Sequence, residues 1–125
     1  MSNAITIVVI DDDASVREAT SGLLRSFGYF AVTYGSAEEF LESTDTLDAS
    51  CVISDVRMPG MDGFTLQSTL IERQYDVPLI LMTAFAEKGG RERALAAGAL
   101  EFLTKPYREQ VLLESVASAV GARHR

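Results

Sequence analysis

The sequence predicts an α/β fold, a doubly wound five-stranded parallel sheet with five helices. Two observations predict it. Five short apolar runs alternate with helical patterns along the 125 residues. Three of these runs, ITIVVI, CVIS and LILM, are almost continuously apolar, which is typical of strands buried on both faces of a parallel sheet.

The first strand is expected over residues 5–10, followed by a helix that ends at Gly28. The apolar stripe expected on the inner face of that helix consists of Val16, Ala19, Leu23 and Phe27. The second strand, residues 30–34, precedes a helix that opens with a capping box. Glu39 lies three residues after Ser36, as that motif requires.

The third strand is expected over residues 51–54, before a third helix. The apolar positions that begin this helix are Phe64, Leu66 and Leu70. The fourth strand, residues 79–82, leads to a helix over residues 87–97, and Gly98 is suited to end that helix.

Two glycines, Gly89 and Gly90, lie inside the fourth helical pattern and are expected to weaken its first turn. The fifth strand spans residues 100–103, and the last helix spans residues 107–120. Its expected inward positions are Val111, Leu112, Val116 and Val120. Right-handed crossovers between such units favour the flavodoxin-like strand order 2-1-3-4-5.

Composition narrows the classes of function. The 125 residues fit one domain, residues 1–125, and no apolar run approaches the length of a membrane span. A net charge of −7 disfavours direct nucleic-acid binding by this domain. The single cysteine, Cys51, lies in an apolar run and is expected in the core, which fits a reducing, cytoplasmic setting. The only histidine, His124, is one residue from the end, which disfavours a histidine-based triad or zinc site.

Polar side chains follow four of the five expected strands. They are Asp11, Asp12 and Asp13 after the first strand, Asp55 after the third, Thr83 after the fourth and Lys105 after the fifth. In a sheet of order 2-1-3-4-5, the carboxyl ends of strands 1 and 3 meet at the topological switch point, where such sheets bind ligands. We therefore expect these side chains to converge on one site.

Clustered carboxylates repel one another unless cations compensate them. Lys105 can supply one cation, and a hard divalent ion such as Mg²⁺, bound by carboxylates and a backbone carbonyl, can supply another. No His or Cys is expected beside these side chains at the site to favour zinc. With the hydroxyl of Thr83 as a donor, such a site suits a phosphoryl group, and a carboxylate can itself become an aspartyl phosphate.

Four segments, VVIDDD, ISDVRMPGMDG, LMTAF and FLTKPY, give the chain a family resemblance. In their order and spacing the chain resembles the receiver domain of bacterial two-component response regulators, over residues 5–120. The resemblance implies a cytoplasmic phosphoprotein of phosphorelay signalling that takes a phosphoryl group from a sensor histidine kinase. The resemblance also implies that the protein is a signalling phosphoacceptor and not an enzyme, since receivers assist only their own phosphorylation and dephosphorylation.

The resemblance also implies roles for individual residues. Asp55 matches the phosphoacceptor. The carboxylates of Asp11, Asp12 and Asp55 and the backbone carbonyl of Arg57 match the ligands of Mg²⁺, or of Mn²⁺ in its place. Asp13 instead suits the N-cap of the first helix, and that is the favoured interpretation for it.

The remaining matches concern the switch. Thr83 matches the hydroxyl that moves toward the phosphate, and Phe102 the switch aromatic. Lys105 matches the lysine that pairs with the phosphate, and Lys105-Pro106 the family's cis peptide. Movement of Thr83 and Phe102 would alter the face formed by helix 4, strand 5 and helix 5. The altered face would favour dimerisation or release an output domain.

The segments SAEEFL and SDVRMPGMDGF resemble the FixJ-like group, whose receivers precede LuxR-type DNA-binding domains. An output domain of that kind, for transcription regulation, would follow a linker that begins at residues 121–125. A single-domain or degenerate receiver that acts as an interaction module is the alternative. An aspartate-nucleophile Mg²⁺ phosphatase is less favoured, because it needs an acid two residues after the nucleophile, where Arg57 stands.

Overall fold

The five apolar runs form one parallel sheet in the computed structural model, which describes residues 5–43 and 49–123. The strands are β1 (Thr6–Ile10), β2 (Phe30–Tyr34), β3 (Cys51–Asp55), β4 (Leu79–Thr83) and β5 (Glu101–Thr104). Their order is β2-β1-β3-β4-β5, and every neighbouring pair is parallel. The predicted fold class and strand order are therefore confirmed.

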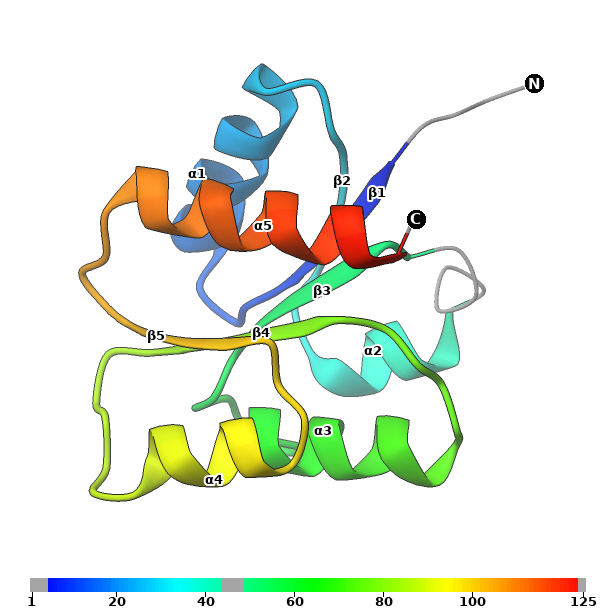
Figure 1. Cartoon of the computed structure of the whole chain (residues 1–125), viewed down its shortest axis with the longest axis vertical. Helices are drawn as coiled ribbons and strands as arrows, with labels where there is room; N and C mark the ends of the chain where they lie inside the picture. The colour runs from blue at the N-terminus through cyan, green and yellow to red at the C-terminus, as the bar shows by residue number, and fades with distance from the viewer. Residues whose placement is uncertain (1–4, 44–48, 124–125) are drawn as a thin grey trace.

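Helices cover both faces of the sheet. They are α1 (Ala14–Ser26), α2 (Ala37–Glu42), α3 (Gly63–Glu72), α4 (Gly90–Ala96) and α5 (Glu109–Arg123). Figure 1 shows α1 and α5 on one face and α2, α3 and α4 on the other. The expected ligand-binding edge is the one where the strands end and the following loops begin. No helix among residues 5–43 and 49–123 is long and apolar enough to cross a membrane.

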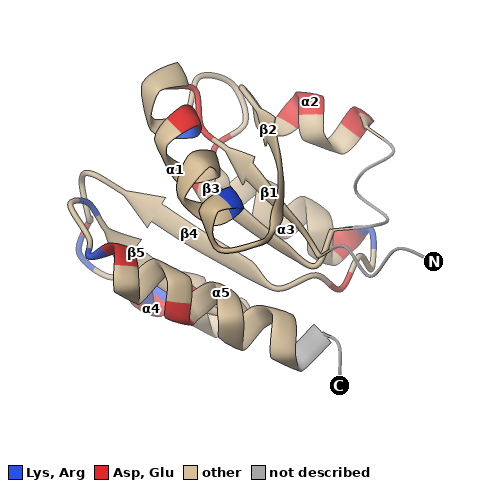
Figure 2. Cartoon of the chain, turned by 90° about the horizontal axis from the view of Figure 1, so that it is seen from above, with Lys and Arg blue, Asp and Glu red and all other residues tan. Residues whose placement is uncertain are grey.

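Burial on both faces explains the apolar runs. All five residues of β3 and all five of β4 are buried, and neither β1 nor β4 carries a charged residue (Figure 2). Alternate residues of β1 supply two cores, Val8 and Ile10 under α2 and α3, and Ile7 and Val9 under α1 and α5. Cys51 is a core residue as predicted, and burial raises the pKa of its thiol to about 12.

The predicted inner face of α1 is confirmed only in part, since Leu23 is half-buried and packs against the core but Ala19 and Phe27 are exposed. The residues of α1 that the structure buries are Thr20, Ser21 and Leu24, while Phe27 is 60% exposed at the end of the helix. Side-chain oxygens can be buried here because a local acceptor is available, as the Ser21 hydroxyl donates to the carbonyl of Glu18 at 3.1 Å. Small polar residues on a packed face carry no apolar signal, so apolar periodicity alone points to a neighbouring face of the helix.

The fourth helix begins later than predicted. Gly89 has φ of +82° and is the N-cap, so residues 87 and 88 precede α4. The left-handed conformation suits glycine, and here it starts the helix where a weak first turn was expected. In α5, Leu112 and Val116 are buried as predicted and Val120 packs half-buried against the core, whereas Val111 is 38% exposed. His124 and residue 125 lie outside the described residues.

Three helix N-caps hold the loops that follow β1, β2 and β3. Asp13 accepts from the backbone N–H groups of Ser15 and Val16, which confirms its predicted capping role. The Ser36 hydroxyl oxygen accepts a hydrogen bond from the backbone N–H of Glu39, which is the first of the two bonds that define a capping box. Asp62 caps α3. Each cap fixes where a helix begins, and so how far each loop extends beyond the sheet.

We expect Gly63→Ala to lower the free energy of unfolding by about 1–3 kcal/mol, the usual cost of overpacking. A Cβ on Gly63 would lie 2.8 Å from the carbonyl oxygen of Asp55 and 2.9 Å from Cα of Val56, and backbone atoms cannot turn aside. Gly22→Ala is the matched control. A Cβ there meets nothing within 4 Å, so this change should stabilise α1 by about 1 kcal/mol.

Urea unfolding of both variants measures the two changes. A Gly63→Ala protein as stable as the wild type would show that the backbone contact after β3 relaxes without cost.

Candidate functional site

The predicted site residues converge at the carboxyl edge of the sheet. Asp11 follows β1, Asp55 ends β3, Thr83 ends β4, and Lys105 follows β5. Parallel pairing brings these ends together, since Asp55 lies opposite Met82 and the N–H of Lys105 donates to the carbonyl of Thr83 at 2.7 Å. The convergence predicted from the strand order is therefore what the register produces.

Three carboxylates meet at this edge. Oxygens of Asp11, Asp12 and Asp55 all lie within 4.8 Å of one another. Asp11 is completely buried, Asp55 is 9% exposed and Asp12 is exposed to solvent. An all-oxygen set of this kind, open on one side, suits a hard divalent ion such as Mg²⁺ that retains part of its water shell.

Lys105 is the cation of the cluster. Its Nζ lies 3.2 Å from Oδ2 of Asp11 and 3.7 Å from Oδ2 of Asp55. Burial acts to lower the pKa of Lys105, but the carboxylates of Asp11 and Asp55 outweigh it, and the pKa is raised. Burial also raises the pKa of Asp55, which Lys105 opposes and Asp11 reinforces. One lysine thus compensates the acidic cluster only in part.

Hydrogen bonds around Asp11 hold its carboxylate in place. The N–H of Asp13 donates to Oδ1 of Asp11 at 2.9 Å, which leaves Oδ2 facing Lys105. The Arg17 guanidinium donates to the backbone carbonyl of Asp11 at 2.7 Å. Arg17 was not identified from the sequence, because nothing in its helical position distinguishes it from a solvated charge.

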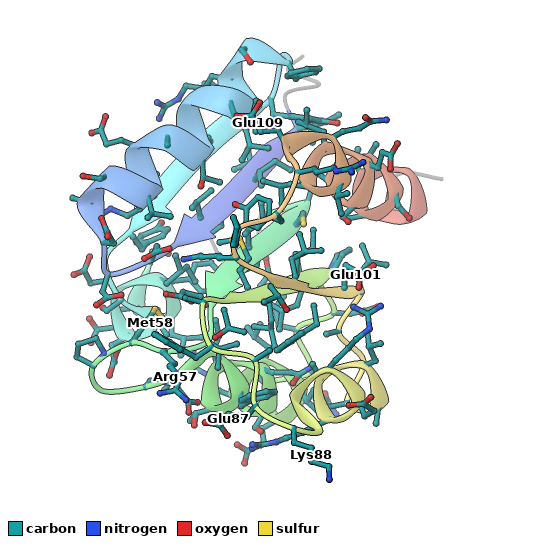
Figure 3. The ribbon with its side chains drawn as sticks, turned by 90° about the vertical axis from the view of Figure 1, so that its left-hand side faces the viewer. Arg57, Met58, Glu87, Lys88, Glu101 and Glu109 are labelled. Atoms are coloured by element: carbon teal, nitrogen blue, oxygen red, sulfur yellow. The ribbon has the colours of Figure 1, made fainter. Side chains whose placement is uncertain are left out.

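The β3–α3 loop carries Arg57, two residues after Asp55. The Arg57 side chain turns away from the acidic cluster to Glu87, with 2.7 Å between Nη2 and Oε1, and its guanidinium lies 5.4 Å from the centre of the Phe85 ring. Figure 3 shows Arg57 and Glu87 side by side on two separate loops. Both side chains of the ion pair are largely exposed, so the pair contributes little to stability. The sequence did not reveal Glu87, since a pair separated by 30 residues leaves no local pattern.

Thr83 and Phe102 line a cavity beside the acidic cluster. Thr83 is 1% exposed, and its hydroxyl lies 3.2 Å from the N–H and 3.3 Å from the carbonyl oxygen of Phe85. Phe102 is 4% exposed and stacks on Phe64, with ring centres 6.4 Å apart. The cavity has a volume of about 580 Å³, and the guanidinium carbon of Arg93 lies 4.1 Å from the centre of the Phe64 ring.

Lys105 and Pro106 are joined by a cis peptide bond, as the resemblance implied. The structure therefore brings Asp11, Asp12, Asp55 and Lys105 into one cluster, with Thr83 and Phe102 beside it.

The chain is similar to known proteins in both sequence and structure. A family model described as the response regulator receiver domain matches residues 7–117. The transcriptional regulatory protein TdiR of Thauera aromatica is 40% identical over 119 residues, which are 95% of this chain and 52% of that protein. The transcriptional regulatory protein FixJ of Bradyrhizobium diazoefficiens is 37% identical over 91% of this chain and 56% of its own.

Among solved structures, the crystal structure of FixJ-N matches with a TM-score of 0.84 and 28% identity, over 96% of each chain. The chain spans about half the length of the curated relatives it matches.

We expect Asp55→Asn to raise the free energy of unfolding of the metal-free protein at neutral pH. Burial raises the pKa of Asp55, so its ionised form is costly in the folded state, and Asn cannot ionise. The unfolded-state pKa of an Asp is about 4, and the folded-state pKa of Asp55 lies above it. The free energy of unfolding of the wild type should therefore fall as the pH rises from the first of these values through the second. The advantage of the variant should therefore grow over that window and disappear below it.

Urea unfolding at a series of pH values measures the difference. Glu42→Gln, an exposed carboxylate in α2, is the control and should stay within about 0.5 kcal/mol of the wild type. A difference that did not change with pH would contradict the assignment of this cost to ionised Asp55.

Proposed function

The chain belongs to the response regulator receiver domain family and is the receiver domain of a two-component response regulator, and from this premise we propose that Asp55 accepts the phosphoryl group. The observation that carries the proposal is the position of Asp55. It lies at the end of β3, with Lys105 3.7 Å from its Oδ2 and the carboxylates of Asp11 and Asp12 beside it. The phosphoryl donor is a phosphohistidine of a sensor histidine kinase.

The proposed metal is Mg²⁺, with Mn²⁺ as the substitute. Asp11, Asp12 and Asp55 would hold it through carboxylate oxygens, and Arg57 through its backbone carbonyl. The all-oxygen donor set, with no His or Cys in the described part of the cluster, supports this choice. When bound, the ion neutralises charge on the transferring phosphoryl group.

The proposed transfer needs little from the protein beyond position and charge. An oxygen of Asp55 forms a P–O bond as the P–N bond of the donor breaks, and the electron pair of that bond returns to the imidazole. Lys105 faces this oxygen and stabilises negative charge that moves from the donor onto Asp55. Hydrolysis by water later restores the carboxylate. The chain thus assists its own phosphorylation and dephosphorylation and does not turn over a separate substrate.

The switch is proposed to act through Thr83. Its hydroxyl is bonded to the backbone of Phe85 in this structure, and it would leave these partners for an oxygen of the phosphoryl group. The β4–α4 loop would lose one of its ties as a result. Phe102 is already inside, against Phe64, so phosphorylation would favour an orientation that the ring adopts here. The affected surface is formed by α4, β5 and α5.

The output is proposed to be transcriptional, through a DNA-binding domain outside residues 1–125, with this receiver making no nucleic-acid contact itself. Relatives named transcriptional regulatory proteins, which are about twice as long, support that proposal. Residues 1–125 would be a single cytoplasmic domain, and phosphorylated copies would pair through the α4, β5 and α5 surface. The assignment of residues 121–125 as a linker rests on the resemblance alone, and residues 124 and 125 lie outside the described part.

Incubation with acetyl phosphate and Mg²⁺ should add one phosphoryl group to the wild type and none to Asp55→Asn. Intact mass is the measurement, with an established receiver labelled in parallel. Omitting Mg²⁺ should abolish most of the adduct, because the repulsion among Asp11, Asp12 and Asp55 then opposes the incoming charge. An adduct that persists in Asp55→Asn would show that another side chain is the acceptor.

Thr83→Ala should be phosphorylated but should switch poorly. A hydrogen bond to a charged group contributes about 1.5–3 kcal/mol, so its loss should shift the phosphorylated equilibrium toward the inactive state by roughly tenfold or more. Amide chemical shifts across β5 and α5, recorded with and without phosphorylation, report this equilibrium. Thr104→Ala removes an exposed hydroxyl at the end of β5 and is the control. Equal shift changes in Thr83→Ala and the wild type would remove Thr83 from the switch.

A further inference from the structure

We propose that Glu38, at the start of α2, is a positioning residue that clasps the apex of the β3–α3 loop and so holds Arg57 in place for the metal. The inference rests on the proposed function, since that loop supplies the proposed backbone ligand. Glu38 touches neither the phosphoryl group nor the ion in this proposal. It acts by restricting the loop that does.

The clasp is a direct contact between two elements far apart in the sequence. Oε2 of Glu38 accepts a hydrogen bond from the backbone N–H of Met61 at 3.0 Å. Glu38 and Met61 are 23 residues apart, so the bond is not part of a local turn. A charged acceptor on a backbone donor makes a stronger bond than a neutral one.

Gly60 shows how closely the carboxylate approaches the loop. A Cβ on Gly60 would lie 2.6 Å from Oε2 of Glu38, a separation that real Cβ atoms do not show. Gly60 also has φ of +76°, where residues with a side chain are strained. The carboxylate therefore lies directly against the backbone of Gly60, and the positive φ of Gly60 is the feature of the apex that requires glycine.

The rest of the loop is tied at its base. The N–H of Val56 donates to the carbonyl of Met82 at 2.8 Å, and the N–H of Gly63 donates to the carbonyl of Val56 at 2.9 Å. Arg57 lies between this tied base and the apex that Glu38 holds. Fixing both ends of a short segment limits the conformations open to its peptide groups, and the carbonyl of Arg57 is one of them.

Glu38 is itself carried by an anchored helix. Ala37 and Phe40, on either side of it in α2, are completely buried, and Ser36 caps the helix. The ring of Phe40 also meets that of Tyr34 edge to face, with centres 5.6 Å apart. Figure 2 shows acidic residues at both ends of α2. Glu42 is the last residue of the helix, so a substitution there is a matched control for one at Glu38.

The first test measures amide hydrogen exchange of Met61 in the metal-free protein. Glu38→Ala should speed this exchange several-fold, because the amide loses its acceptor. Glu38→Gln keeps an acceptor oxygen and should retain most of the protection, and Glu42→Ala should match the wild type. Unchanged exchange in Glu38→Ala would overturn the clasp, whatever the metal does.

The second test measures the dissociation constant of Mg²⁺ by calorimetric titration. Glu38→Ala should weaken binding roughly tenfold, the lower end for losing a residue that orients a ligand group. Glu38→Gln should recover most of the affinity, and Glu42→Ala should stay within about twofold of the wild type. If Glu38→Gln binds as weakly as Glu38→Ala, the effect is one of charge and the positioning role is overturned.

The two tests separate the inference from its premise. A wild type that binds no Mg²⁺ overturns the proposed metal site, and the positioning role with it, even if Met61 exchange responds as expected. If the wild type binds Mg²⁺ and Glu38→Ala binds it equally tightly, the positioning role alone is overturned. Equal thermal midpoints of the variants without metal exclude a general loss of folding as the cause.

Discussion

Repulsion among three carboxylates at the carboxyl edge of the sheet is the constraint on which the site depends. Carboxylate oxygens of Asp11, Asp12 and Asp55 lie close enough together to bind one metal ion. The ammonium group of Lys105 faces Asp11 and Asp55. One ammonium cannot balance three carboxylates, so the metal-free site carries excess negative charge. An incoming phosphoryl group would add to that charge, and a second cation such as the proposed Mg²⁺ would offset it.

The fold sustains this repulsion because the charged residues are attached to rigid strands. β3 and β4 are buried throughout, and their parallel pairing leaves no freedom for Asp55 to withdraw. Gly63 allows the chain to pass directly against the backbone of Asp55 and Val56 as it enters α3. The same packing that produces a stable sheet therefore keeps like charges together, at some cost to stability, where a ligand can relieve them.

The loops around the cluster are joined to one another across the edge of the sheet. Arg57 pairs with Glu87, Thr83 bonds to the backbone of Phe85, and Glu38 holds Met61. The first two contacts connect the β4–α4 loop with the site, and residues of that loop line one cavity together with Phe64 and Phe102. These contacts are the ones through which the proposed phosphorylation of Asp55 would act on α4.

The order of residues alone was enough to predict the fold class, the strand order and which side chains gather at one edge of the sheet. Buried parallel strands leave continuous apolar runs, and the residue after each run falls at the same edge, so Asp11, Asp55, Thr83 and Lys105 could be grouped before any coordinates. The folded chain was needed to show which face of α1 is buried, where α4 begins, and which side chains join one loop to another. Thr20 and Ser21 pack without an apolar signal, and Glu38 and Glu87 find partners 23 and 30 residues away. Such contacts follow from where loops meet in space, which no periodicity along the chain encodes.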